Sequence, residues 1–261
     1  MYTLGTLITL LMIPMTTIAM NKLRYIPYTQ LHPGQHSFTS KEVAEKIAKA
    51  LEKGHAAYNE QTAAYTFSHH EGQSIFSSND ALPVVKKSDD CYLLVDGHHS
   101  VLASIKLGAK MICVKIINDL SKHKEHAFWE EAEQKGYAYL YPVDGEPRIP
   151  PYRFKDMVDD PYRWLPHLLK GLVPADGDLK QYSGPKYPVW IKCGKGVPFI
   201  EFAIARALRK GGISFSYSTQ LSDAMVEDCR KILLEATICG LRVVPTRTLF
   251  SKLICVPEAC E

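Results

Sequence analysis

Two adjacent histidines follow an Asp-Gly pair in the stretch VDGHHSVLASIKLG, residues 95–108. The pair lies where a hydrophobic run ends and a helical pattern begins. A histidine at such a place could donate a hydrogen bond to a phosphate oxygen or move a proton near neutral pH. Asp96 could orient an imidazole, hold a cation or act as a base. The residue types therefore allow a catalytic centre formed by Asp96, His98 and His99.

The backbone expected around these histidines also suits an anion. A loop between a strand and a helix presents N–H groups at the positive end of the helix dipole, which favours phosphate. Gly97 lets the chain turn sharply and lets a ligand come close. A polar turn is the competing interpretation, because Asp-Gly is common in turns and a polar residue before a helix is often only its cap. The residues of this loop alone leave both interpretations open.

The elements that must position the loop form a compact unit. LPVVKK (82–87) and CYLLV (91–95) are predicted strands joined by a tight turn, and DGHHS (96–100) follows them as a loop. VLASIKLG (101–108) is a predicted helix, and MICVKII (111–117) is a further strand. Ligands gather at the carboxyl ends of strands in such α/β units, which favours a functional interpretation of the loop.

The segment ahead of this unit has its own signals. Residues 25–31 alternate enough for a short first strand. Thr39 and Glu42 have the spacing of a capping box, and a predicted helix runs from them to Gly54. Residues 55–81 show no clear period and are predicted to be a loop or a small insertion.

The sequence predicts mainly helices in the second half of the chain. Ser121 is predicted to open a helix that ends at Gly136, and two later helices are predicted after Pro198 and Ser222. The tyrosines at 137, 139 and 141 alternate as a half-buried strand would.

The fold class expected from these elements is α/β (α+β), with a small mixed sheet and helices followed by a mostly helical C-terminal extension. The predicted division is a core over residues 20–136 and an extension over 137–261 that packs on it.

The unit from Leu82 to Leu120 resembles the ParB/sulfiredoxin superfamily, in which a strand, a loop and a helix form a nucleotide-phosphate pocket. The chain is most similar to the ParB-like nuclease branch, and the resemblance runs from about Tyr25 to Arg209. The matching motifs are Leu31, Pro33 and Gln35, then Lys41-Glu42-Val43, Asp96 with His98 and His99, Phe128-Trp129, and Asp159-Asp160-Pro161-Tyr162-Arg163.

This resemblance implies phosphodiester hydrolysis at a nucleotide or phosphate pocket in the DGHHS loop. The implied catalytic residues are Asp96, His98 and His99, and the implied phosphate- or ligand-binding residues are Gly97, Ser100, Gln35, Lys41, Asp160 and Arg163.

The chain departs from its superfamily at one informative position. Many relatives carry Arg directly after the second histidine, where this chain has Ser100, and the change removes a bidentate phosphate clamp. A kinase of the free-serine type, which would use a nucleotide to phosphorylate a small molecule, is one alternative to a nuclease. A non-catalytic ligand-binding module is another. Asp159-Asp160 also has a purely structural interpretation, as the capped start of a helix.

Metal and nucleic-acid sites receive little support. The pairs His69-His70 and His123/His126 lack a third ligand at a recognisable spacing, so no metal site is predicted. The formal charge is only +3 and no long basic tract occurs. Nucleic acid therefore stays a candidate ligand without a strong electrostatic signature. A divalent metal or a nucleotide as cofactor is left open.

The first nineteen residues carry no charge and end in a small residue, Ala19. They resemble the apolar core and cleavage region of a secretory signal, which predicts export to the periplasm. No Lys or Arg precedes the run and Pro14 interrupts it, so a cytoplasmic protein that starts at Met20 is the alternative. A stable membrane span is not expected after processing. Cys255 and Cys260 could form a disulfide if the protein is exported.

Overall fold

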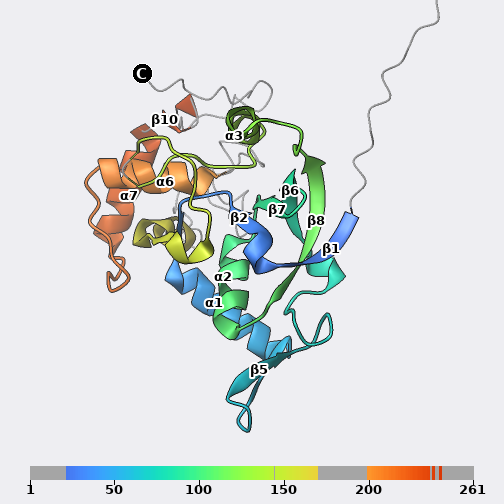
Figure 1. Cartoon of the computed structure of the whole chain (residues 1–261). Coiled ribbons are helices and arrows are strands. Elements are labelled where there is room, and N and C mark those ends of the chain that lie inside the picture. The colour runs from blue at the N-terminus through green and yellow to red at the C-terminus, as the bar shows by residue number, and fades with distance from the viewer. Residues whose placement is uncertain (1–21, 144, 170–198, 236, 239–240, 243–261) are drawn as a thin grey trace, which may run out of the picture.

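The structure is a computed structural model that describes residues 22–143, 145–169, 199–235, 237–238 and 241–242 (Figure 1). The predicted signal at residues 1–19, Pro198, and the pair Cys255 and Cys260 lie outside the described residues, so export and the disulfide stay predictions. Among the described residues, no helix is both long and apolar enough to cross a bilayer.

The core of the fold is a five-stranded mixed sheet in the order β1-β8-β6-β7-β2. The hairpin β6–β7 is antiparallel, as is the pair β1–β8, whereas β6–β8 and β2–β7 are parallel. This mixed sheet confirms the α/β class expected from the sequence. The strands are β1 (Lys22–Pro27), β2 (Leu31–Pro33), β6 (Leu82–Ser88), β7 (Cys91–Leu94) and β8 (Met111–Asp119).

The single first strand predicted over residues 25–31 is in fact two strands. A 3-10 turn at Tyr28–Gln30 separates β1 from β2, and the two strands lie at opposite edges of the sheet. Pro27 ends β1 because proline has no backbone N–H to continue the hydrogen-bond ladder. The alternating pattern therefore identified extended chain but did not indicate that the chain passes from one edge of the sheet to the other between β1 and β2.

Two helices, α1 (Ser40–Glu52) and α2 (His98–Leu107), pack against each other beside the sheet (Figure 1). The main core cluster lies between these helices and the strands. Burial of such side chains contributes about 1.5–3 kcal/mol each. The fully buried members that α1, α2 and the central strands contribute are Val43, Val84, Leu94, Val101, Ala103, Ile112 and Val114.

Helix α2 begins three residues earlier than predicted. Gly97 is its N-terminal cap, with a φ of +89°, and His98 is its first residue. Glycine adopts this left-handed conformation without steric cost, so the reversal after β7 is complete within one residue. His98, His99 and Ser100 therefore form a buried helical turn and do not belong to a loop.

Residues 55–81 contain a hairpin that the sequence did not reveal. β4 (Ala56–Asn59) and β5 (Ala64–Phe67) are antiparallel and project away from the main sheet (Figure 1). Four residues in each strand are too few to establish an alternating pattern, so the sequence predicted a loop or a small insertion without indicating the hairpin. A 3-10 turn at Ser78–Asp80 leads from this insertion into β6.

Helix α3 (Glu125–Gln134) starts later than the predicted Ser121. The Ser121 hydroxyl and N–H both donate to Asp119 Oδ1, at 2.6 and 3.0 Å, which holds this stretch in a turn. Phe128 and Trp129 are buried core residues, as expected. Residues 137–141 form no strand.

Within the extension predicted over residues 137–261, the residues that the structure describes after 150 are mostly helical, as predicted. The side chain of Ser222 caps α7 (Asp223–Glu235) and accepts the Met225 N–H at 3.2 Å. A separate apolar cluster joins the helices at residues 165–169, 200–210 and 223–235 through Leu165, Ile204, Leu208 and Leu233. The division at residue 136 stays a prediction. The elements are a 3-10 turn at Phe154–Asp156, β9 (Val158–Asp159) paired with β3 (Ser37–Phe38), a 3-10 turn at Pro161–Arg163, α4 (Leu165–Leu169), α6 (Ile200–Lys210), α7 (Asp223–Glu235), β10 (Thr237–Ile238) and β11 (Leu241–Arg242).

The two glycines that bound α2 give a matched test of this geometry. Gly108 has a φ of +88° and open space around a hypothetical Cβ, whereas a Cβ on Gly97 would meet Leu82 Cδ2 at 2.7 Å. We expect Gly108→Ala to lower the free energy of unfolding by about 1–2 kcal/mol through backbone strain alone. Gly97→Ala should cost about 1–3 kcal/mol more, because the methyl group also displaces Leu82. Urea denaturation of both variants measures the difference, and equal losses would contradict the contact with Leu82.

Candidate functional site

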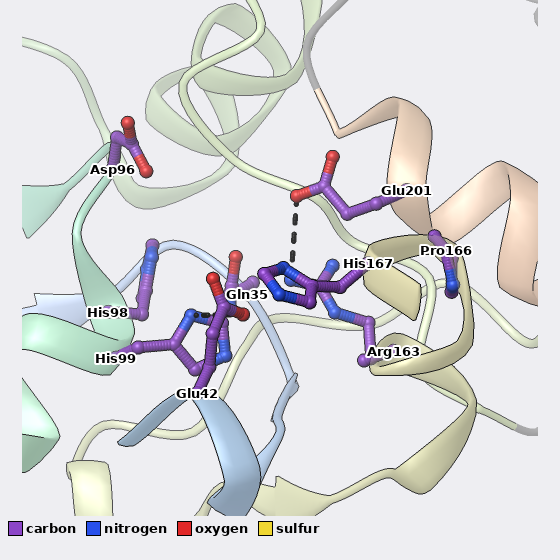
Figure 2. A pocket seen from close by; sticks show the side chains of 9 residues that line it. All are labelled: Gln35, Glu42, Asp96, His98, His99, Arg163, Pro166, His167 and Glu201. Atoms are coloured by element: carbon purple, nitrogen blue, oxygen red, sulfur yellow. Dashed lines mark ion pairs between the residues drawn. The ribbon is translucent and has the colours of Figure 1, made fainter. Parts of the chain in front are cut away.

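A polar cavity of about 140 Å³ lies at the N-terminal end of α2 (Figure 2). It is large enough for a few water molecules or a small ligand, since a water molecule occupies about 30 Å³ in the liquid. Segments far apart in the sequence meet there. The lining residues are Gln35, Glu42, Asp96, His98, His99, Arg163, Pro166, His167 and Glu201.

The cavity brings together five of the nine site residues expected from the sequence: Gln35, Asp96, His98, His99 and Arg163. The other four do not line it. Gly97 and Ser100 belong to the backbone turn that carries the histidines, and Lys41 points into solvent from α1. The carboxylate of Asp160 accepts the Tyr162 N–H at 3.1 Å and pairs with Arg209 at 2.7 Å. That carboxylate caps a helical turn, as its structural interpretation predicts.

His98 holds the segment after β2 against α2. Its ring is 3% exposed, and its Nε2 accepts the backbone N–H of Gly34 at 2.9 Å. An acceptor Nε2 places the ring proton on Nδ1 in the neutral tautomer. Burial lowers the pKa of His98 to about 3, with a further contribution from Arg163 and an opposing one from a backbone hydrogen bond with Leu94. His98 is therefore neutral near neutral pH.

His99 makes the equivalent contact with the start of α1. Its Nε2 accepts the Thr39 N–H at 3.1 Å, and its Nδ1 lies 3.1 Å from Glu42 Oε2. Burial lowers the pKa of His99 to about 2, and the positive charge of Arg163 adds to this effect. The contact is thus a hydrogen bond from a neutral imidazole to a carboxylate.

The capping box predicted for Thr39 and Glu42 is not formed. The Thr39 side chain makes no capping hydrogen bond within α1, and its N–H is taken by His99. Glu42 turns to His99 and lines the cavity. A local motif was sufficient to explain Glu42 from the sequence, whereas the tertiary contact takes precedence in the fold.

Both histidines thus use Nε2 to hold backbone N–H groups. A neutral imidazole has one acceptor nitrogen. Proton transfer through Nε2 of either ring would require a buried backbone N–H to be released, which costs about 1–3 kcal/mol. The catalytic role expected for His98 and His99 stays a prediction, and the geometry gives both rings a positioning role as well.

Arg163 supplies the positive charge of the cavity. It is 5% exposed, its guanidinium carbon lies 3.4 Å from the centre of the Phe202 ring, and its Nη2 lies 3.4 Å from Glu201 Oε1. Nε and Nη1 are buried and have no hydrogen-bond partner in the described part of the chain. Arg163 lines the cavity and its guanidinium is incompletely paired, a combination suited to an anion. The guanidinium that lines this cavity comes from the 3-10 turn at Pro161–Arg163 and not from the first turn of α2.

Sequence reasoning missed Pro166, His167 and Glu201. His167 lies one helical turn after Arg163, so the i,i+4 spacing could have found it. Its ring stacks on Trp164 at 4.2 Å, and its Nε2 is 4.0 Å from Glu45 Oε1, beyond hydrogen-bond distance. Glu201 lies on α6 and gives no sequence signal, because only tertiary packing brings it to Arg163.

The cavity also shows which ligands its walls could hold. The first N–H groups of α2 and the Arg163 guanidinium both favour an anion. Over the described residues, no group of three or more His, Cys, Asp or Glu side chains is arranged to hold a metal ion.

The buried histidines make stability depend on pH. Burial also lowers the pKa of His32, to about 4. The unfolded chain protonates these rings near pH 6.5, whereas the folded chain does so only well below that value, so unfolding takes up protons. We expect the free energy of unfolding to be constant above about pH 7. It should fall as the pH drops through 6.5 towards 4, by up to about 1.4 kcal/mol per pH unit for each of His32, His98 and His99.

Urea denaturation at pH 8, 6.5, 5.5 and 5 measures this slope. His126→Asn should leave it unchanged, because the His126 side chain is 88% exposed. A free energy of unfolding that stays constant from pH 8 to pH 5 would contradict this, because it would show that the rings take up protons equally in the folded and the unfolded chain.

Comparisons with known proteins agree with this architecture. The crystal structure of protein Atu1540 from Agrobacterium tumefaciens is similar, with a TM-score of 0.55 and 23% sequence identity. The likeness covers 83% of this chain and 93% of that chain, and it shows the fold alone. A search of curated proteins found no match. The family model described as "Putative ParB-like nuclease" matches residues 25–183, and the mixed sheet with its helices fits a ParB/sulfiredoxin-like fold. The chain therefore belongs to the ParB-like nuclease family.

Proposed function

We propose that the protein hydrolyses a phosphodiester whose phosphate binds at Arg163, beside the N-terminus of α2. One observation carries the proposal: a guanidinium that is 95% buried has two nitrogens without a partner in the described part of the chain, and it lines a polar cavity. Burial of an incompletely paired charge is expensive unless a ligand compensates it. A phosphate with one oxygen on Nε and another on Nη2 would form the bidentate contact that arginine favours, and it would displace the long contact between Nη2 and Glu201.

Gln35 is suited to hold the attacking water. Its Nε2 donates to the Ser37 carbonyl oxygen at 2.8 Å, which leaves Oε1 as an acceptor on the cavity side. A water held by Oε1 next to a phosphate on Arg163 would lie close to phosphorus. Holding both reactants in place lowers the entropic part of the barrier.

Asp96 and His167 are the lining groups best placed to move protons. Asp96 Oδ1 accepts the Gly97 N–H at 2.6 Å, and its other oxygen stays available. No hydrogen bond from the described residues occupies either ring nitrogen of His167. In hydrolysis, the bond from water oxygen to phosphorus forms as the ester P–O bond breaks. One of these two side chains takes the proton of the water, and the other gives a proton to the departing alkoxide.

In this proposal, His98 and His99 act through what they hold. His98 fixes Gly34, next to Gln35, and His99 fixes Thr39 and the carboxylate of Glu42. A non-catalytic phosphoester-binding module is the second candidate. The specific observation in its favour is that both Nε2 atoms already accept backbone N–H groups.

Arg163 provides the test of phosphate binding. We expect Arg163→Gln to fold normally, because it removes an incompletely paired buried charge and leaves the surface unchanged. Binding of inorganic phosphate, measured by calorimetry, should weaken about 10- to 100-fold through the loss of charge-assisted hydrogen bonds. Arg153→Gln is the matched control, since Arg153 lies on the surface and pairs with Asp156. Equal affinities of Arg163→Gln and wild type would contradict the proposal.

His167 separates the two candidate functions. If the protein is an enzyme, His167→Asn should lower kcat for bis(p-nitrophenyl) phosphate about 10²- to 10⁴-fold with little change in Tm. His126→Asn, an exposed histidine on α3, should keep wild-type turnover. Phosphate binding without any turnover in the wild-type chain would favour the binding module.

A further inference from the structure

The cavity is acidic as well as basic. Glu42, Asp96 and Glu201 line it together with Arg163. Because burial keeps His98 and His99 neutral, three carboxylates face one guanidinium there, which gives these lining groups a formal charge of −2. A site for phosphate alone would not need this excess of negative charge. The low-dielectric walls of a cavity focus the electric field of its charges, so the excess negative charge acts strongly on any ligand that enters.

Each carboxylate has one oxygen engaged within the described structure. Glu42 Oε2 accepts from His99 Nδ1, and Asp96 Oδ1 accepts the Gly97 N–H. Glu201 Oε1 lies 3.4 Å from Arg163 Nη2, a long contact. The second oxygen of each group remains to accept a hydrogen bond from a ligand. Figure 2 shows the Glu201 carboxylate beside the guanidinium of Arg163, and the Asp96 carboxylate apart from both.

A metal ion is a poor occupant for these carboxylates. In the part of the chain that the structure describes, no three metal-binding side chains are grouped to hold one. The guanidinium beside Glu201 would also repel a divalent cation. An organic ammonium attached to the phosphoester suits the arrangement better, because its N–H groups can donate to a carboxylate oxygen without the full set of ligands that a metal ion needs.

We propose that the ligand of this cavity is a small phosphoester that also carries an ammonium group, with the phosphate on Arg163 and the ammonium on Glu201. This inference rests on the proposed phosphate site at Arg163 and names the substrate class for it. Glu201 lies beyond residues 25–183, which match the family model, so this chain's C-terminal extension supplies the selectivity. A polyanionic nucleic acid would meet three carboxylates and gain one cation.

A pair of ligands that differ in the ammonium alone tests the inference. Calorimetry on the full chain compares 2-aminoethyl phosphate with ethyl phosphate. We expect 2-aminoethyl phosphate to bind about tenfold more tightly, as one charge-assisted hydrogen bond allows. Glu201→Gln should remove this preference, and it should leave ethyl phosphate binding unchanged or tighter, because the competing carboxylate next to Arg163 is gone. Glu227→Gln is the matched control, since Glu227 pairs with Arg230 on α7, away from the cavity.

Other outcomes overturn the inference in distinguishable ways. Equal binding of the two phosphoesters would sink the ammonium site and leave the phosphate site intact. Equal weakening of both ligands in Glu201→Gln would assign Glu201 a positioning role on Arg163. Tighter binding of a single-stranded oligonucleotide than of either phosphoester would overturn the inference in favour of nucleic acid. Failure of inorganic phosphate and both phosphoesters to bind would overturn this inference and the proposed function together.

Discussion

The site depends on one pair of hydrogen bonds, from the backbone N–H groups of Gly34 and Thr39 to the Nε2 atoms of His98 and His99. They connect the segment between β2 and α1 to the first turn of α2, and so form one wall of the cavity. Each works only while its ring is neutral, since a protonated imidazole has no acceptor. Burial keeps the pKa of both rings far below neutrality, so the wall persists at physiological pH.

Neutral histidines also decide how charge is distributed. With both rings uncharged, Arg163 is a cation without a full set of partners in the described part of the chain, and Glu42 is a carboxylate with a neutral donor. The stacking of Arg163 on Phe202 and its long contact with Glu201 hold the guanidinium in place without satisfying Nε or Nη1. The fold thus bears the cost of a buried, incompletely paired charge, which a ligand can offset.

The sequence predicted the part of this arrangement that local signals encode. Apolar runs and turn residues predicted β6, β7 and β8, and Gly97 at the end of β7 marked the turn into α2. Three features depended on distant contacts. Glu42 matched a capping box but binds His99. Glu201 reaches Arg163 only because α6 packs against α4 and the 3-10 turn before it. The hairpin at residues 56–67 has strands too short to show an alternating pattern. Local pattern cannot reveal which partner a polar side chain meets across the fold.

Ser100 stands at the position where the resemblance predicts Arg, yet a guanidinium still lines the cavity. A guanidinium next to the second histidine would approach a phosphate from the first turn of α2. In this chain Arg163 reaches the cavity from the 3-10 turn that follows β9, so the phosphate that we propose would still meet a cation. The guanidinium of Arg163 shares the cavity with Glu201 of α6. A guanidinium on α2 would not need Glu201 beside it. If phosphate binds at Arg163 as we propose, moving the cation to another segment changes which side chains lie beside the phosphate, and this would change which ligands the cavity selects.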